Sequence, residues 1–263
     1  MTQHRHRKRT LIDELTGRYP ASAREELFAQ VLCGEVYVNG ERVRDSKRKV
    51  TSSCDIQFRP IRRYVSRGGI KLEHALSRFA LEPIGLTIID AGSSTGGFTD
   101  CLLQRRAAHV YAVDVGRNLL SYRLRNDSRV TVLEGTNILD LDKTQISGTV
   151  DAAVVDVSFR SILRIPSRLL SFTAGGWVLA LVKPQFEWRN PDQCFRGVIT
   201  SKLTRRAILT ELIESLREES VCVGAIEPSP ITGRRGNKEF FFLLFADSGA
   251  AHPDLTARID EVL

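Results

Sequence analysis

The first 58 residues place hydrophobic side chains at the spacing of two short amphipathic helices. Leu11, Ile12 and Leu15 would lie on one face of the first helix. The second helix would begin at a capping box, the segment SARE at residues 22–25, and end at Gly34, a residue type common at helix C-termini. Its apolar face would consist of Leu27, Phe28, Val31 and Leu32.

A β-hairpin is predicted directly after these helices. In VYVNGERV, residues 36–43, apolar and polar residues alternate around Asn39-Gly40, a pair typical of a two-residue hairpin turn. The helices and the hairpin indicate a small α+β module that ends near residue 58. We place this module at residues 1–60, a charged linker at residues 61–65, and a second domain at residues 66–263.

From residue 66 onward, short apolar runs alternate with stretches of helical length. The runs have the length of buried strands and lie at residues 87–89, 110–113, 130–133, 152–155 and 177–182. This alternation predicts a doubly wound α/β fold with a mostly parallel sheet. The continuous run FFFLLFA, residues 240–246, predicts one further buried strand late in the chain.

Charged residues follow four of these predicted strands: Asp90, Asp114, Asp156 and Lys183. An aspartate at such a position often only caps the next helix. The carboxyl ends of parallel strands lie along one edge of the sheet, however, and ligands of open α/β folds bind at this edge. Four charged side chains on one edge therefore indicate a functional site.

The glycine-rich segment DAGSSTGGFTD, residues 90–100, departs from two nucleotide-binding patterns. Phe98 stands where the lysine of a P-loop would be, and Ser94 replaces the second glycine of the dinucleotide pattern G-x-G-x-x-G. Asp114, after the second strand, is suited to bind the two hydroxyls of a ribose. A ligand with a ribose but no phosphate fits these features best, and S-adenosylmethionine is the common cofactor of this kind.

The cofactor would lie against the glycine turn, where the backbone can approach a ligand closely. Its ribose would lie at Asp114 and its adenine near Asn137, which is otherwise an ordinary turn residue. The predicted cofactor-binding residues are Asp90, Gly92, Ser93, Gly96, Gly97, Phe98, Asp114, Asn137 and Asp156.

Positive charge is concentrated in the first module. The first 64 residues contain 14 Lys and Arg against 8 Asp and Glu, a net charge of +6, whereas the remaining residues contain 24 against 23, a net charge of +1. Such an excess is typical of a module that grips nucleic acid, or of a solvated basic surface. Five Cys without C-x-x-C spacing predict no disulfide framework and no metal site, and they indicate a cytoplasmic location. The lack of a long apolar run predicts a soluble protein.

The segments SARE and GEVYVNGERV of the first module resemble the S4 RNA-binding domain. This resemblance implies that the module binds structured RNA. The candidate phosphate contacts are Arg18, Arg24, Arg42, Arg44, Lys47 and Arg48.

Five longer motifs follow one another along the chain: SRGGIKLEHAL at residues 66–76, DAGSSTGGFTDCLLQ at 90–104, VVDVSF at 154–159, LVKPQFE at 181–187 and GNKEFFF at 236–242. Together they are similar to the TlyA (hemolysin A) family of RNA 2′-O-methyltransferases, which is related to the FtsJ-type enzymes. The resemblance implies a Rossmann-like methyltransferase fold behind an S4 domain, with S-adenosylmethionine as cofactor. It also implies methylation of a ribose 2′-hydroxyl, expected at a cytidine of ribosomal RNA, free or in a ribosomal subunit.

FtsJ-type enzymes carry a Lys-Asp-Lys-Glu tetrad, and the resemblance places it on Lys71, Asp156, Lys183 and Glu239. A ribose 2′-hydroxyl is a poor nucleophile that must lose its proton as it attacks the methyl group. A lysine amine accepts a proton only in its neutral form, which burial and a second nearby cation favour. We therefore expect Lys183 to be the base and Lys71 to orient the hydroxyl, while Asp156 and Glu239 hold the two lysines.

Three other functions compete with this interpretation. A non-enzymatic RNA-binding or ribosome-assembly factor could keep the fold without the chemistry, although the complete tetrad argues against it. A pore-forming hemolysin is disfavoured because the sequence contains no long apolar span and no repeated alternating segments. A nicotinamide-dependent oxidoreductase is disfavoured by Ser94 in the dinucleotide pattern.

Overall fold

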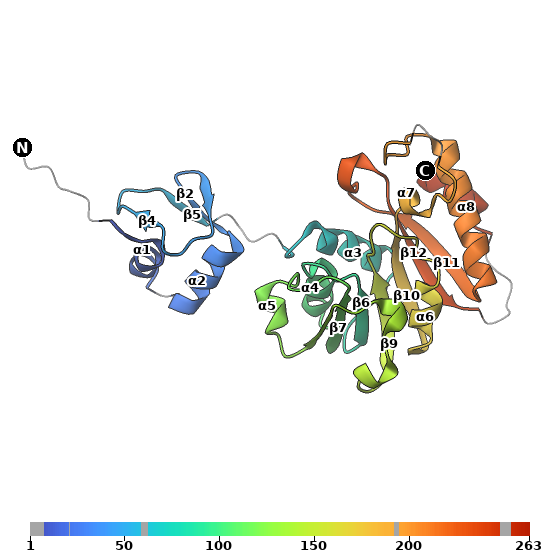
Figure 1. Ribbon diagram of the computed structural model, residues 1–263, viewed down its shortest axis with the longest axis horizontal. Helices are drawn as coiled ribbons and strands as arrows, with labels where there is room; N and C mark the ends of the chain where they lie inside the picture. Colours follow the sequence, from blue (N-terminus) through green and yellow to red (C-terminus); the bar gives the residue numbers. More distant parts are fainter. Residues whose placement is uncertain (1–7, 21, 59–62, 192–194, 248–253) are drawn as a thin grey trace, which may run out of the picture. The chain divides into compact units, whose positions relative to one another are not determined.

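The structure is a computed structural model that describes residues 8–20, 22–58, 63–191, 195–247 and 254–263. The chain divides into two compact units, Met1–Arg62 and Arg63–Leu263 (Figure 1). Residues 61 and 62 of the predicted linker lie outside the described residues. Tyr64 and Val65 belong to the second unit, because the Tyr64 side chain is buried there and the Val65 N–H donates to the Asp100 carboxylate over 2.8 Å.

The first unit combines helices with short antiparallel strands. Its described elements are β1 (Arg9–Thr10), α1 (Leu11–Arg18), α2 (Arg24–Cys33), β2 (Val36–Val38), β3 (Glu41–Val43), β4 (Lys49–Val50) and β5 (Ile56–Phe58). Strands β3, β2 and β5 form one sheet, and β1 pairs with β4. The predicted hairpin is confirmed, since Asn39 and Gly40 between β2 and β3 have φ values of 51° and 79°, as this type of turn requires.

Helix α2 differs from the prediction in two respects. The capping box at residues 22–25 is wrong, because the N-cap is Ala23 and the first helical hydrogen bond runs from the Leu27 N–H to the Ala23 carbonyl. The predicted apolar face is only half buried: Leu27 and Val31 are enclosed, whereas Phe28 and Leu32 are 43% and 49% exposed. These two residues are turned by about 100° from the buried pair around the helix axis. Gly34 ends the helix in the left-handed conformation, as predicted.

The second unit is built around a seven-stranded sheet with the order β11-β12-β10-β9-β6-β7-β8. The strands are β6 (Thr87–Ala91), β7 (His109–Asp114), β8 (Val130–Glu134), β9 (Val150–Val155), β10 (Thr173–Val182), β11 (Val221–Pro228) and β12 (Phe240–Ala246). Neighbouring strands from β10 to β8 pair in parallel, whereas β12 pairs antiparallel with both β10 and β11. The predicted mostly parallel sheet is confirmed.

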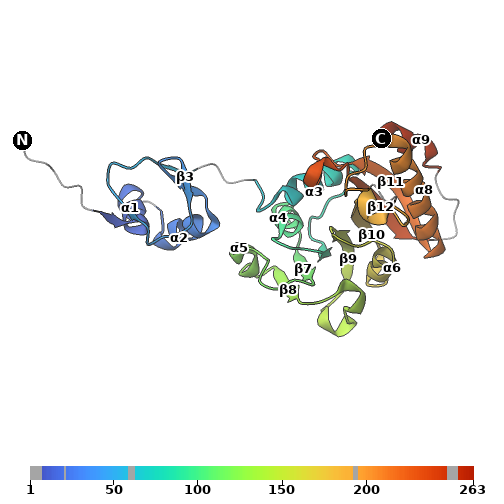
Figure 2. The same cartoon turned by 45° about the horizontal axis from the view of Figure 1, so that its top comes forward.

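Helices cover both faces of this sheet (Figure 2). On one face lie α3 (Arg67–Arg78), α4 (Gly97–Gln104) and α5 (Tyr122–Arg125), and on the other α6 (Ile165–Leu170), α8 (Lys202–Glu218) and α9 (Thr256–Val262). Successive strand residues point into opposite layers: Ile88 belongs to the hydrophobic layer that contains α3 and α4, and Ile89 to the layer that contains α6 and α8. The strands read as continuous apolar runs because both of their faces are buried.

The smaller elements lie in the loops. They are α7 (Pro184–Glu187) and the 3-10 helices η1 (Ile138–Asp140), η2 (Lys143–Gln145) and η3 (Arg234–Gly236). Strand β11 was not predicted from the sequence, although its segment VCVGAI, residues 221–226, is apolar apart from Gly224. Its pairing with β12 shifts register between Val223 and Ala225. Within the described residues, no helix is long and apolar enough to cross a membrane.

Candidate active site

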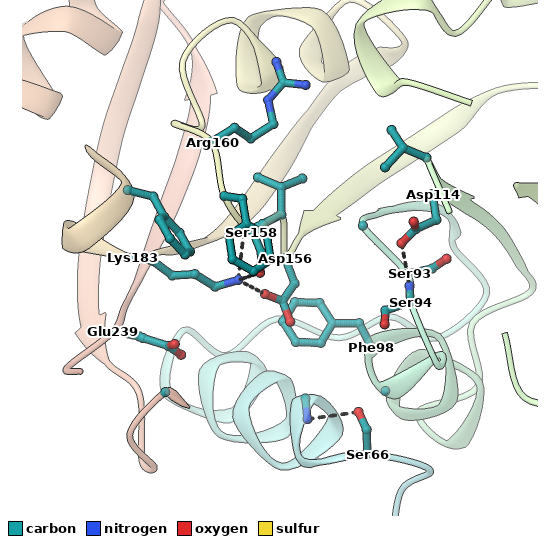
Figure 3. A pocket seen from close by; sticks show the side chains of 18 of the residues that line it. Ser66, Ser93, Ser94, Phe98, Asp114, Asp156, Ser158, Arg160, Lys183 and Glu239 are labelled. Carbon is teal, nitrogen blue, oxygen red and sulfur yellow. Dashed lines mark hydrogen bonds and ion pairs between the residues drawn. The ribbon is translucent and has the colours of Figure 1, made fainter. Parts of the chain in front are cut away.

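A pocket of about 880 Å³ lies at the carboxyl ends of the parallel strands (Figure 3). Its walls come from the loops after β6, β7, β8, β9 and β10, from the start of α3, and from the segment before β12. Because β12 is antiparallel, its first residue, Phe240, pairs with Val182 at the end of β10. This register brings Glu239 to the edge of the sheet where Lys183 follows β10.

The glycine-rich turn between β6 and α4 forms one wall of the pocket. Gly92 has a φ of 85°, and a Cβ atom there would lie 2.7 Å from the carbonyl oxygen of Asp156. A Cβ atom on Gly97 would lie 2.1 Å from the hydroxyl of Ser66. Neither position tolerates a side chain. Between them, Ser93 lines the pocket with a buried hydroxyl that has no hydrogen-bond partner within the described residues, so a polar ligand could supply one.

The Asp114 carboxylate is held in place at the end of β7. It accepts the N–H groups of Ser94 at 2.8 Å and of Gly116 at 2.7 Å, and it lines the pocket (Figure 3). Asn137 has two functions in the structure: its side chain caps η1 by accepting the Leu139 N–H at 3.2 Å, and it also lines the pocket.

Two of the nine predicted cofactor-binding residues, Asp90 and Gly96, do not line the pocket. Strand β6 continues through Ala91, so Asp90 lies inside the strand rather than after it and is fully buried. Asp90 Oδ2 accepts a hydrogen bond from Thr99 at 2.6 Å, and burial raises the pKa of Asp90 to about 7. Gly96 is the N-cap of α4, packed against Leu124. The pocket wall contains the other seven: Gly92, Ser93, Gly97, Phe98, Asp114, Asn137 and Asp156.

Two lysine–carboxylate ion pairs lie in this pocket. Lys183 Nζ is 2.6 Å from Asp156 Oδ1, and it donates to the Val157 carbonyl at 2.7 Å and to Ser158 Oγ at 2.9 Å (Figure 3). Lys71, on α3, pairs with Glu239, which lies 168 positions later in the chain. All four residues of the predicted tetrad thus line one pocket, and each lysine has its own acid.

Both lysines are buried, as is Glu239, whereas Asp156 is half-buried. A buried ammonium group is stable only beside a compensating charge, and loss of one partner leaves the other uncompensated. The two pairs therefore keep amine groups at the pocket surface that would otherwise be expelled to solvent.

Comparison with known proteins identifies the family. Residues 64–245 match the FtsJ-like methyltransferase model, which is more than half of the chain. The chain belongs to the FtsJ-like methyltransferase family. The predicted enzyme class and the Rossmann-like fold of the second unit are thereby confirmed.

Relatives of this FtsJ-like methyltransferase match over nearly the whole chain. A Bacillus subtilis protein provisionally named rRNA methyltransferase YqxC is 39% identical over 249 residues, 93% of this chain and 87% of the relative. The Mycobacterium tuberculosis 16S/23S rRNA (cytidine-2′-O)-methyltransferase TlyA is 36% identical over 241 residues, 90% of each protein. A solved structure from Streptococcus thermophilus, provisionally described as a hemolysin, has 35% identity and a TM-score of 0.73, covering 98% of this chain and 94% of that one. The resemblance to the TlyA family is confirmed.

The pocket mouth of this methyltransferase carries an aromatic pair that was not predicted from the sequence. Phe159 is 86% exposed, has a φ of 63°, and lies 5.5 Å from Phe186 between ring centroids. Each phenylalanine stands three residues after a charged residue that follows a strand, Asp156 or Lys183. This repeated spacing in VVDVSF and LVKPQFE is the sequence feature that could have predicted the pair. Three exposed arginines, Arg67, Arg160 and Arg235, also line the pocket.

The predicted RNA-binding residues of the first unit have mixed surroundings. Arg18 donates to Glu14 at 2.9 Å and to the carbonyls of Ser52 and Cys54, so its guanidinium also holds the unit together. Arg24 pairs with Asp13, Arg48 pairs with Glu41, and Arg42 donates to the Gly34 carbonyl. Arg44 and Lys47 are exposed.

Proposed function

We propose that this methyltransferase transfers a methyl group from S-adenosylmethionine to the 2′-hydroxyl of a ribose, at a cytidine of ribosomal RNA, and that it acts in the cytoplasm. The observation that carries the proposal is the pairing of Lys183 with Asp156 and of Lys71 with Glu239 in one pocket. Amines held at a pocket surface by acids suit a reaction in which a hydroxyl must lose a proton.

The chain's own residues divide this task. In its neutral form, Lys183 would receive the proton of the hydroxyl, and Lys71 would donate a hydrogen bond that orients the hydroxyl. Asp156 and Glu239 would hold the two amines in position. Fixing the hydroxyl and the base relative to each other removes much of the entropic barrier of the reaction.

The pocket also suits the proposed cofactor, which supplies a methyl group bound to a positively charged sulfur. Asp114 would accept the two hydroxyls of the cofactor ribose, since its carboxylate is already oriented by backbone N–H groups. The unpartnered hydroxyl of Ser93 would meet the polar amino-acid end. Asn137 and the apolar side chains of Leu119 and Ile138 would surround the adenine.

An RNA substrate is supported by the pocket mouth and by the first unit. Exposed aromatic rings such as Phe159 stack on unpaired bases, and arginines such as Arg67, Arg160 and Arg235 bind phosphates. The S4-like first unit, placed at residues 1–60, would add further phosphate contacts through the six basic residues named above. The cytidine and the ribosomal RNA are proposed because a relative with 36% identity carries this activity in its name.

Two variants test the proposal on different steps. Lys183→Ala should lower methyl transfer about 10²–10⁴-fold, because it removes the base, and should leave S-adenosylmethionine binding nearly unchanged. Asp114→Ala should instead weaken cofactor binding about 10- to 100-fold, because hydrogen bonds to a charged group are lost. Ribose methylation of ribosomal RNA is mapped by mass spectrometry, and cofactor affinity is measured by calorimetry.

Lys202→Ala, at the exposed start of α8, is the matched lysine control and should behave like the wild type. Undiminished transfer by Lys183→Ala would remove Lys183 as the base. A wild-type protein that binds RNA but no S-adenosylmethionine would favour a non-enzymatic RNA-binding factor.

A further inference from the structure

The amine of Lys183 is surrounded by three oxygen atoms, all within 2.9 Å. They belong to the Asp156 carboxylate, the Val157 carbonyl and the Ser158 hydroxyl. A lysine ammonium has three N–H donors and no lone pair. In its protonated form, Lys183 therefore has a partner for every donor.

The neutral form of Lys183 imposes a different requirement. A neutral amine has two N–H donors and one lone pair, so one of the three neighbours must donate a hydrogen bond instead of accepting one. An ionised carboxylate and a backbone carbonyl only accept, whereas a serine hydroxyl can do either. The lone pair of neutral Lys183 is therefore directed at the hydroxyl hydrogen of Ser158.

Ser158 also lies on the substrate side of the lysine. The Lys183 side chain is 8% exposed, whereas Ser158 is exposed and lines the pocket. Its loop is fixed from behind, because Glu187 of α7 accepts hydrogen bonds from Ser161 Oγ at 2.5 Å and from the Ile162 N–H at 3.1 Å. A substrate hydroxyl that enters the pocket can meet the Ser158 oxygen without displacing any partner of Lys183.

We propose that Ser158 is a further catalytic residue, which relays the proton of the substrate hydroxyl to Lys183; this inference rests on the proposed function. As the substrate oxygen forms its bond to the methyl carbon and the carbon–sulfur bond breaks, the substrate proton moves to Ser158 Oγ. The hydroxyl proton of Ser158 moves at the same time to the lone pair of Lys183. The step starts with a neutral amine and a sulfonium and ends with an ammonium, a thioether and a methyl ether, so atoms and charge balance.

Single-turnover methyl transfer by Ser158→Ala and Ser158→Thr tests the relay. Ser158→Ala should transfer about 10²-fold or more slowly, because general acid–base steps contribute factors of this size. Ser158→Thr keeps a hydroxyl and should stay within about tenfold of the wild type. The double variant Ser158→Ala/Lys183→Ala should be no slower than Lys183→Ala alone, because groups that act as one unit are not additive. S-adenosylmethionine affinity, measured by calorimetry, should be the same in these four variants as in the wild type.

The rate in mixtures of H₂O and D₂O gives an independent readout. Because two protons move in the same step, the single-turnover rate of the wild type and of Ser158→Thr should decrease non-linearly as the deuterium fraction of the solvent rises. A linear dependence, or no isotope effect, overturns the relay. The relay is also overturned if Ser158→Ala keeps the wild-type rate, or if it loses cofactor affinity together with rate. A wild-type protein that binds S-adenosylmethionine and methylates no ribose contradicts the proposed function itself.

Discussion

Asp90 and Asp114, one on each of two adjacent strands, have opposite surroundings. Asp114 ends β7 and faces the pocket, with its carboxylate held by two N–H groups. Asp90 lies one residue before the end of β6, and its Oδ1 atom is buried without a hydrogen-bond partner in the described part of the chain. The sequence placed both residues at strand ends, but strand ends cannot be located to one residue from apolar patterning alone. A single extra strand residue decides whether such a carboxylate meets a ligand or the protein interior.

Asp90→Asn should change how stability depends on pH. Burial raises the folded-state pKa of Asp90 to about 7, above the ordinary value of 3.8, so the folded protein holds this proton more tightly than the unfolded chain. The stability that comes from this tighter proton binding is therefore complete below pH 4 and is lost as the pH rises from 4 to 7. It amounts to about 1.4 kcal/mol for each unit by which the folded and unfolded pKa values of Asp90 differ. Between pH 5 and pH 8, the free energy of unfolding measured with urea should decrease less for Asp90→Asn than for the wild type.

Asp140→Asn provides the control for this comparison, because Asp140 is exposed. It should retain the pH dependence of the wild type. If the free energy of unfolding depended on pH in the same way for Asp90→Asn and for the wild type, the Asp90 carboxyl would already be ionised in the folded protein at pH 5.

Among the elements, strands with an uninterrupted apolar run could be predicted, whereas a strand interrupted by a glycine and the four-residue helix α7 could not. The five parallel strands and β12 are continuous apolar runs because helices cover both faces of the sheet. Gly224 interrupts the apolar residues of β11, where the pairing with β12 also shifts register, and α7 has only four residues, too few to show a helical period. The missed helix is nevertheless part of the site, since it carries Phe186 and Glu187 directly after Lys183.

Glu187→Ala should loosen the loop that follows β9. The Glu187 carboxylate accepts from the Ser161 hydroxyl and from the Ile162 N–H, so its removal leaves a buried N–H group without a partner. The expected cost is about 1–3 kcal/mol of unfolding free energy. Methyl transfer should fall about tenfold or more, because Asp156 and Ser158 lie in the same loop.

Glu187→Gln keeps an acceptor of the same shape and should restore most of both properties. Chemical unfolding and steady-state methylation measure the two effects. Equal activity of Glu187→Ala and the wild type would show that α7 is not needed to hold this loop.

On the scale of the whole molecule, charge and periodicity predict a boundary between two parts of the chain near residue 60. The first 64 residues have a net charge of +6, and the elements predicted there are short. In the structure, Met1–Arg62 forms a compact unit separate from the rest of the chain. Patterning could not show which basic residues face a ligand, because hydrogen bonds within the unit depend on tertiary contacts. Arg18, for example, is bound to carbonyl groups of residues 34 and 36 positions away.

Deletion of residues 1–62 should reduce RNA affinity at least about tenfold near 0.1 M salt and leave S-adenosylmethionine binding intact. Fewer phosphate contacts also predict a shallower fall of log affinity with log salt concentration, by about 0.7 per lost contact for single-stranded RNA. Filter binding across a salt series measures both quantities. The full-length double variant Arg44→Glu/Lys47→Glu should shift them in the same direction, and an unchanged salt dependence in both proteins would exclude the first unit from RNA binding.

The antiparallel direction of β12 has a consequence for the synthesis of this protein. Lys71 is translated early in the second unit, but its counter-ion, Glu239, is added to the chain 168 residues later. The strand that follows Glu239 also inserts between β10 and β11, so one late segment closes the sheet and supplies the last acid together. A nascent chain interrupted before this segment has neither a finished sheet nor a compensated lysine, so the active site is complete only after β12 has been made and has inserted.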